Sequence, residues 1–256
     1  MCGICGFIGF NDDGLLRSML SSIKHRGPDA QGVFVDGADG VSLGHARLSI
    51  IDLSSSGRQP MGNEDGSINV VLNGEIYNYL ELKQELIKQG HVFKSKTDTE
   101  VILHLYEEKG VNLLDDLDGM FAFALYDKRN KRFFLARDRL GIKPCYYSLG
   151  NDGSLVFSSE LKALLLNKRL PLDLDYTALC DHLTFLWAPS PKTVLKNVRK
   201  LEPGHFITIE NGTFRNPVDG AYLWAKASLG HADLRGTIAS YAKDTGEAAV
   251  KENVAN

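Results

Sequence analysis

The sequence predicts an α+β fold, in which helices pack on antiparallel β-sheets. Short apolar runs rich in aromatic residues are separated by Asp, Asn, Gly and Lys turns, as is typical of antiparallel strands joined by hairpins. Helical patterns occur between groups of these runs but do not alternate with them strictly, so a parallel sheet of βαβ units is not expected.

The first half of the chain is expected to hold four strands and three helices. Apolar runs interrupted by turn residues predict strands at 1–10, 31–35, 43–51 and 69–72. Apolar residues at helical spacing predict helices at 15–23, around 80–87 with a stop at Gly90, and between a Thr99 cap and Gly110. The segment His25–Asp29, with its Gly-Pro pair, is expected to form a turn.

The second half continues with hairpins and two more helices. Strands are predicted at 120–126, 132–136, 145–149, 155–157 and 206–209. Helices are expected at about 159–167 and 175–183, and residues 184–203 form a proline-containing connection. Asn211-Gly212 is a hairpin turn signal. The Ala-rich segment 216–256 differs in character and is left unassigned.

Composition excludes several classes of protein. The chain has 256 residues and a net charge of -3, with no basic block that suggests nucleic acid or an anionic membrane. No apolar run approaches the roughly 20 residues that span a bilayer. The N-terminal residues lack the features of a secretion signal, so a cytoplasmic location is expected.

Four cysteines in a chain of this length do not suggest a disulfide framework. Cys2 and Cys5 have a C-x-x-C spacing, but a zinc site would need a second pair, and the histidines show no i, i+4 pair and no H-E-x-x-H motif. No metal is therefore expected. Cys5, Cys145 and Cys180 are interpreted as small buried hydrophobic residues.

Cys2 directly follows the initiator methionine. Removal of Met1 would leave a thiol and a free α-amine on one residue. An α-amine has a pKa of about 7.7–8.0 and can accept a proton near neutral pH. This pairing is typical of N-terminal nucleophiles. Position alone does not decide between such a role and chance.

Other residues suit the cleavage of an amide. Asn73 offers two side-chain N–H donors, and Gly74 lets a backbone N–H approach an oxyanion, although Asn-Gly is also a common turn. Arg47 lies in an apolar stretch and could bind a carboxylate through two parallel hydrogen bonds. Glu75 or Asp98 could bind an ammonium group.

Eight motifs occur in an order that resembles one family. They are Met-Cys-Gly-Ile-Cys-Gly-Phe at 1–7, His-Arg-Gly-Pro-Asp at 25–29, Gly-His-Ala-Arg-Leu-Ser-Ile-Ile-Asp-Leu at 44–53, Gly-Arg-Gln-Pro-Met at 57–61, Asn-Gly-Glu-Ile-Tyr-Asn-Tyr at 73–79, Thr-Asp-Thr-Glu at 97–100, Leu-Asp-Gly-Met-Phe-Ala-Phe-Ala at 117–124 and Ala-Arg-Asp-Arg-Leu-Gly-Ile-Lys-Pro at 136–144. Residues 1–215 resemble the N-terminal glutaminase domain of glutamine-hydrolysing asparagine synthetase, a class II glutamine amidotransferase of the N-terminal-nucleophile hydrolase fold.

The resemblance implies four layers, αββα, and assigns roles to single residues. Cys2 is implied as the nucleophile, with Asn73 and Gly74 in the oxyanion hole. The residues implied to contact L-glutamine are Arg47, Leu48, Ile50, Glu75 and Asp98. The resemblance assigns 117–144 to the sheet, with Arg137 and Asp138 as candidates for an internal ion pair.

The chain departs from that family in one respect. The Ser-Gly-Gly-x-Asp-Ser motif of the ATP-using synthetase domain does not occur in it, nor does a P-loop. ATP and Mg²⁺ are therefore expected only for a synthetase part, and this chain is expected to need no cofactor. Aspartate is the first candidate for the amide acceptor, and another carboxylate such as a sugar acid is an alternative. A donor or interaction subunit that docks on a separate synthetase is the other alternative.

Overall fold

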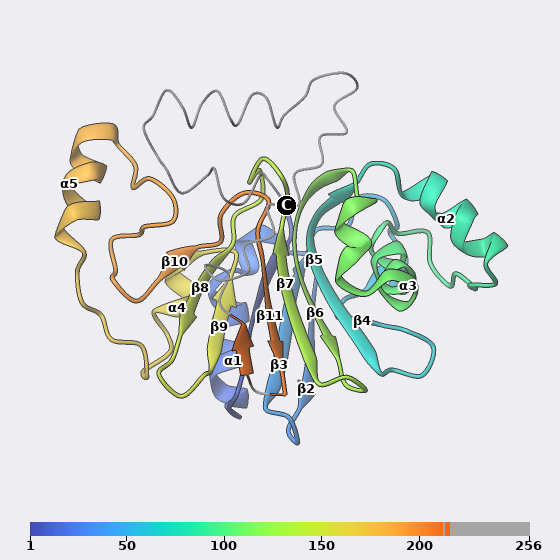
Figure 1. Cartoon of the computed structure of the whole chain (residues 1–256), viewed down its shortest axis with the longest axis horizontal. Helices are drawn as coiled ribbons and strands as arrows, with labels where there is room; N and C mark the ends of the chain where they lie inside the picture. The colour runs from blue at the N-terminus through green and yellow to red at the C-terminus, as the bar shows by residue number, and fades with distance from the viewer. Residues whose placement is uncertain (212, 216–256) are drawn as a thin grey trace.

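Two six-stranded antiparallel sheets lie face to face between two layers of helices (Figure 1). The computed structural model describes residues 1–211 and 213–215. Helices α1 and α4 cover the outer face of one sheet, and α2 and α3 lie on the outer side of the other. Both the α+β prediction and the αββα layering implied by the resemblance are confirmed.

The first sheet has the strand order β10-β8-β9-β1-β3-β2. Its strands are β1 (Gly3–Ile8), β2 (Ala30–Asp36), β3 (Val41–Arg47), β8 (Tyr146–Leu149), β9 (Leu155–Ser158) and β10 (Arg199–Lys200). The second sheet has the order β12-β11-β7-β6-β5-β4. Its strands are β4 (Met61–Gly62), β5 (Ile68–Ile76), β6 (Gly119–Asp127), β7 (Arg132–Arg137), β11 (Phe206–Glu210) and β12 (Thr213–Arg215).

Five α-helices and three short 3-10 turns connect these strands in the described part of the chain. The helices are α1 (Asp13–Ser22), α2 (Tyr79–Lys88), α3 (Thr99–Lys109), α4 (Leu161–Leu164) and α5 (Tyr176–Phe185). The 3-10 turns span Lys24–Arg26, Ser55–Gly57 and Gly110–Asp115. Asp12 caps α1 by accepting from Leu15 N at 2.8 Å, and Asp175 caps α5 in the same way.

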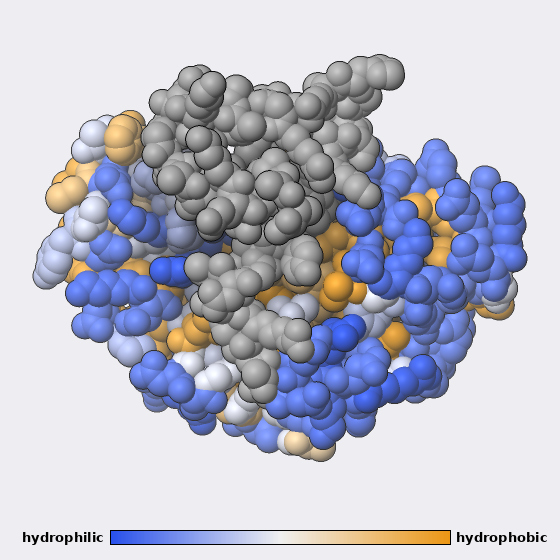
Figure 2. Space-filling view, viewed as in Figure 1, coloured by the Kyte–Doolittle hydropathy of each residue, from blue (hydrophilic) through white to orange (hydrophobic). Residues whose placement is uncertain are grey.

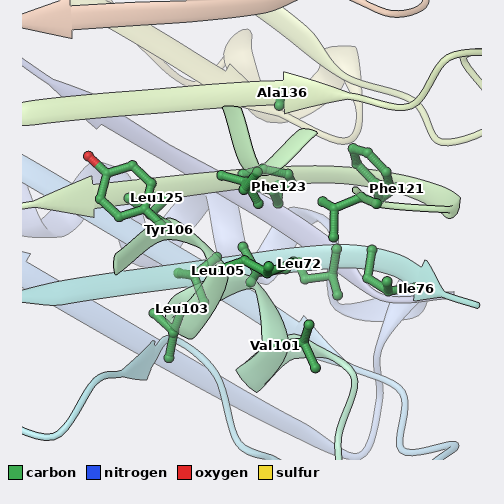
Figure 3. Packing of buried hydrophobic residues seen from close by; sticks show 14 of the residues in the cluster. Leu72, Ile76, Val101, Leu103, Leu105, Tyr106, Phe121, Phe123, Leu125 and Ala136 are labelled. Carbon is green, nitrogen blue, oxygen red and sulfur yellow. The ribbon is translucent and has the colours of Figure 1, made fainter. Parts of the chain in front are cut away.

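Each strand sends alternate side chains to opposite layers, and this alternation builds three cores. On β5, Val70 and Leu72 face the helices, whereas Val71 faces the other sheet. Figure 3 shows the helix-side core, where Leu72 and Ile76 lie close to Val101 and Leu105 of α3. The same alternation turns Asn73 towards the first sheet, because it is two residues beyond Val71.

Two predicted boundaries were wrong for a common reason. The strand predicted at 43–51 ends at Arg47, because Leu48 N and Ser49 N donate to the side chains of Cys2 and Asp29 instead of a neighbouring strand. The helix predicted at 159–167 is only α4, since Ser159 N still bonds to Ile4 O of β1 at 2.9 Å. In each case a hydrogen bond to a residue distant in sequence replaces the strand or helix hydrogen bond that the local pattern predicts.

Three predictions about single residues also need correction. Asn73 and Gly74 lie inside β5 and not in a turn after it. Cys180 is exposed on α5, whereas Cys5 and Cys145 are buried as predicted. Arg137 and Asp138 do not pair with each other: Arg137 donates to backbone carbonyls of Gly141, Lys143 and Leu201, and Asp138 accepts from backbone N–H groups such as Phe121 N.

The division predicted at residue 215 and the unassigned segment 216–256 fall outside the described residues, as does Gly212 of the predicted hairpin turn. Among the helices that the structure describes, none combines the length and apolarity that crossing a bilayer requires. Figure 2 shows a largely hydrophilic surface over α2 and hydrophobic patches over α5. The exposed apolar residues at the C-terminal end of α5 are Leu183, Phe185, Leu186 and Trp187.

Candidate active site

All eight residues singled out in the sequence line one pocket at the end of the layer between the sheets. These residues are Cys2, Arg47, Leu48, Ile50, Asn73, Gly74, Glu75 and Asp98. Strand alternation explains how three of them meet. Cys2, Arg47 and Asn73 are each two residues along the strand direction from an inward-facing residue: Ile4, His45 and Val71, respectively.

The Cys2 thiol is held by the backbone of Leu48. Leu48 N donates to Sγ at 3.4 Å, and Sγ lies 3.5 Å from Leu48 O. The carbonyl of Cys2 accepts a 2.9 Å bond from Arg26 Nε, and Arg26 in turn contacts Glu160 at 3.1 Å. Cys2 is therefore held both through its side-chain sulfur and through its backbone carbonyl.

Burial raises the pKa of the Cys2 thiol above its usual value. The Leu48 N–H, the terminal ammonium and Arg47 oppose this effect, while the negative Asp98 reinforces it. A thiol with a raised pKa is a poor nucleophile until a base removes its proton. Attack by this thiol therefore requires a general base next to the sulfur. An α-amine on the same residue would be such a base.

Arg47 is almost completely buried, at 8% exposure. Its Nη1 donates to Ser54 O at 2.9 Å and its Nη2 donates to Asp52 O, so two of its five N–H groups hold the loop that follows β3. A Cβ at Gly57 would lie 2.4 Å from Arg47 Nη2, so this glycine makes room for the guanidinium. The remaining donors can bind an anion in the pocket.

Asn73 is fully buried in β5 and carries an unsatisfied oxygen. Its Nδ2 lies 3.5 Å from Ser159 Oγ, and its Oδ1 has no hydrogen-bond partner within the described structure. The preceding carbonyl, Leu72 O, is 3.1 Å from His45 Nε2 of β3. Burial lowers the pKa of His45 to about 4, so the ring is neutral and ties the two sheets together next to Asn73.

Gly74 is required by its neighbouring strand. A Cβ at this position would lie 2.2 Å from Met120 O and 2.6 Å from the Cα of Phe121, both on β6. No side chain fits in that space. This steric reason for the glycine is separate from the one expected from the sequence, which was the approach of its N–H to an oxyanion.

Asp98 precedes α3 and provides the acidic side of the pocket. Its Oδ2 accepts from Ile76 N at 2.8 Å, which fixes the carboxylate beside the end of β5. Burial raises the pKa of Asp98 to about 6, and the nearby Glu75 charge adds to the shift. A cationic ligand would relieve both effects, so this part of the pocket is suited to an ammonium group.

Sequence reasoning missed four residues that support the site. Arg26 donates to the carbonyl of Cys2, and Ser159 contacts the side chain of Asn73, as described above. Gln59 accepts from Leu72 N at 2.6 Å and donates to Thr99 at 3.0 Å, so it connects β5 to α3. Lys143 lines the pocket and lies 3.4 Å from the Met1 sulfur. Arg26, Gln59 and Lys143 occur within the quoted motifs, which was the only available signal.

Comparison with known proteins identifies the family. A profile described as a glutamine amidotransferase domain matches residues 1–232. The chain belongs to this family. The matched range includes every residue of the pocket.

This glutamine amidotransferase domain is similar to part of larger proteins. It is 40% identical over 216 residues to asparagine synthetase [glutamine-hydrolyzing] 1 of Bacillus subtilis, covering 80% of this chain and 33% of the relative. It is 48% identical over 169 residues to asparagine synthetase [glutamine-hydrolyzing] 2 of Oryza sativa, covering 64% and 28%. The chain thus spans about a third or less of the length of these two curated relatives.

Solved structures support the fold assignment. The glutamine phosphoribosylpyrophosphate amidotransferase of B. subtilis superposes with a TM-score of 0.62 at 23% identity, covering 84% of this chain and 48% of that one. At this level of identity the likeness concerns the fold alone.

Proposed function

We propose that this chain, once Met1 is removed, hydrolyses L-glutamine to glutamate and ammonia with Cys2 as the nucleophile. The observation that carries the proposal is the convergence of Cys2, Arg47, Asn73 and Asp98 on one pocket. Met1 is 59% exposed, so an aminopeptidase can reach it. Its removal would place the new α-amine on the residue that bears the thiol.

The reaction begins when the Cys2 amine takes the thiol proton and the sulfur attacks the side-chain amide carbon of glutamine. Asn73 Nδ2 and the Gly74 N–H stabilise the oxyanion of the tetrahedral intermediate. The protonated amine then gives its proton to the leaving nitrogen, and ammonia departs. Water, activated by the same amine, attacks the γ-glutamyl thioester and releases glutamate with the regenerated thiol.

Substrate recognition follows from the charges in the pocket. Arg47 binds the α-carboxylate with the donors that the loop does not use. Asp98, with Glu75 beside it, binds the α-ammonium. Leu48 and Ile50 contact the rest of the substrate from the loop after β3. Only an amino acid with both charged groups and a side chain of the right length would bring its carbonyl to the sulfur.

The curated relatives extend well beyond the part that matches this chain, and their names join glutamine hydrolysis to asparagine synthesis. We infer that the ammonia serves the ATP-dependent amidation of aspartate or of another carboxylate such as a sugar acid, with ATP and Mg²⁺ bound by a synthetase part. All four cysteines are free thiols, which fits action in the reducing cytoplasm.

A donor subunit that docks on a separate synthetase is the second candidate function. One observation favours a docking role: the end of α5 exposes Leu183, Phe185 and Trp187 at 73%, 58% and 56%. An apolar cluster of this kind is typical of a contact surface. A donor subunit would carry out the glutaminase reaction for an acceptor bound by another chain, whereas a pure interaction subunit would release no ammonia.

A glutaminase assay on the purified full chain tests the proposal. Wild-type protein should release glutamate and ammonia in equal amounts, and Cys2→Ala should release neither while remaining folded. A wild-type chain that lacks Met1 but produces no glutamate would refute glutaminase activity. It would leave binding or docking as the function of this domain.

A further inference from the structure

We propose that His91, His104 and Glu107 form a zinc site that fastens α3 to the segment following α2. The three residues lie outside the pocket that contains Cys2. His104 and Glu107 are three residues apart on α3, and His91 belongs to the loop that returns from α2. One ligand atom from each residue lies within 4.8 Å of the other two.

The distances within this cluster match the geometry of a metal site. Glu107 Oε2 lies 3.1 Å from His104 Nδ1 and 3.6 Å from His91 Nδ1. Two ligand atoms that each bind a tetrahedral zinc at about 2.1 Å are separated by about 3.4 Å. The two imidazole rings lie side by side, with their centroids 4.6 Å apart. Both nitrogen–oxygen distances are therefore close to the spacing that two ligands of one zinc ion have.

The second ring nitrogen of His91 supports ligation through Nδ1. His91 Nε2 lies 2.8 Å from Glu108 Oε1, a hydrogen bond in which the imidazole is the donor. In the tautomer with its proton on Nε2, the Nδ1 lone pair faces the Glu107 carboxylate, 3.6 Å away. A lone pair opposite an anion is unfavourable unless a cation lies between them. Metal-bound histidines commonly donate their other N–H to a carboxylate in this way.

His104 leads to the same conclusion. It is 1% exposed, and its Nε2 has no hydrogen-bond partner in the described structure. Two carboxylates, of Glu64 and Glu100, lie 4.0 Å from that nitrogen. Ligation through Nδ1 places the ring proton on Nε2, where it faces these negative charges. Without a cation, the hydrogen bond from Nδ1 to Glu107 Oε2 leaves an unprotonated, buried Nε2 that faces the same two carboxylates.

The carboxylate is also positioned for one metal bond. Asn63, in the turn after β4, donates from Nδ2 to Glu107 Oε1 at 2.8 Å. This leaves Oε2 as the single ligand oxygen. Two imidazoles and one carboxylate suit Zn²⁺ and leave a fourth position for water. Sequence spacing does not reveal the site, because His91 and His104 are 13 residues apart and meet only through the packing of α2 against α3.

The test is a zinc titration of the full chain against a chromogenic chelator. The thiol and amine of Cys2 can themselves bind zinc, so every protein carries Cys2→Ser. This protein should bind one zinc ion, and its melting temperature should rise with free Zn²⁺. His91→Gln and His104→Gln should weaken binding at least about 100-fold, and Asn63→Ala about 10- to 100-fold. His182→Gln, on the exposed surface of α5, is the matched control and should bind zinc normally.

His91 is more exposed than His104, so His91→Gln tests the ligand set even if His104→Gln fails to fold. Absence of stoichiometric zinc binding in folded Cys2→Ser protein would overturn the proposal. Equal zinc affinity in the His91→Gln and His182→Gln proteins would also overturn it. The result does not depend on glutaminase activity, which Cys2→Ser removes.

Discussion

The side-chain Nδ2 of Asn73 and the hydroxyl of Ser159 lie 3.5 Å apart across the two sheets, and both residues are fully buried. Ser159 Oγ already accepts from Ile4 N at 3.0 Å, so its own proton is available. A half-turn of the Asn73 amide would let Ser159 donate to Oδ1, the atom that has no partner. Both hydrogens of Nδ2 would then be free for an oxyanion.

Ser159→Ala should therefore lower kcat for glutamine hydrolysis with little change in KM. The loss of one neutral hydrogen bond, about 0.5–1.5 kcal/mol, corresponds to roughly a 2- to 10-fold decrease. Ser158→Ala is the matched control, because its equally buried hydroxyl bonds to Ile4 O at 3.2 Å and not to Asn73. Equal kinetics in the two variants would mean that Ser159 does not orient the amide.

Asn73→Ala should have a larger effect, because it removes an oxyanion donor outright. Turnover is expected to decrease by about 10²–10³, measured as kcat in the glutaminase assay. Asn69→Ala, four residues earlier on β5, removes a side chain that bonds to Gly66 O and lies outside the pocket. Near-normal turnover of Asn73→Ala would exclude the oxyanion role.

Arg47→Lys should mainly weaken the binding of glutamine. A lysine keeps the charge but cannot bind a carboxylate with two parallel bonds while also holding the carbonyls of Asp52 and Ser54. A lost charged hydrogen bond of about 1.5–3 kcal/mol predicts a KM increase of roughly 10- to 100-fold. Arg58→Lys, an exposed residue outside the pocket, should retain the wild-type KM. An unchanged KM in Arg47→Lys would argue against carboxylate binding by Arg47.

The raised pKa of Asp98, about 6, predicts a pH dependence of substrate binding. An ammonium group binds the charged carboxylate, so KM should rise as the pH falls below about 6. Asp98→Asn should show a high KM with no such dependence. A KM for the wild type that stays constant between pH 7 and pH 5 would contradict this role.

The raised pKa of Asp98 also affects the stability of the fold. Its effect on the pH dependence of stability is opposite to that of most carboxylates, whose pKa is lowered by folding. Because the folded state holds the proton more tightly than the unfolded state, the stability contribution of Asp98 decreases as the pH rises from about 4 to about 6. Asp98→Asn should therefore raise the melting temperature at pH 7 while it impairs binding. A lower melting temperature of this variant at pH 7 would show that the charged form is well stabilised in the free protein.

Gly74→Ala should destabilise the fold as well as affect catalysis. The added methyl would collide with the β6 backbone, which cannot move away without disturbing the sheet. Overpacking of this kind costs about 1–3 kcal/mol, measurable by denaturant unfolding. Gly62→Ala is the control, since its Cβ would meet no atom closer than 3.3 Å. Equal stability of the two variants would mean that the β5–β6 contact is less tight than the structure shows.

Much of the pocket could be predicted from the sequence because it depends on strand periodicity. The apolar runs around Cys2, Arg47 and Asn73 indicated three strands, and alternate residues of a strand share one face. The order of the motifs then supplied the family and the roles. What the runs could not show is which strands are neighbours, because β1 and β3 lie in one sheet and β5 in the other.

The remaining features arise from contacts between distant residues. Ser159 reaches Asn73 across 86 positions of sequence, and Arg26 reaches Glu160 across 134. The short helix α4 is limited by a bond to β1 that no local pattern encodes. The predicted pairing of the half-buried Arg137 with the buried Asp138 is wrong, because each side chain hydrogen-bonds to backbone groups brought close by the fold.

The most direct test of the account is mass spectrometry of the enzyme quenched in acid during glutamine turnover. The account predicts a γ-glutamyl thioester on Cys2, in a peptide whose first residue is Cys2 with an unmodified amine. An adduct on the exposed Cys180, or active protein that retains Met1, would contradict it.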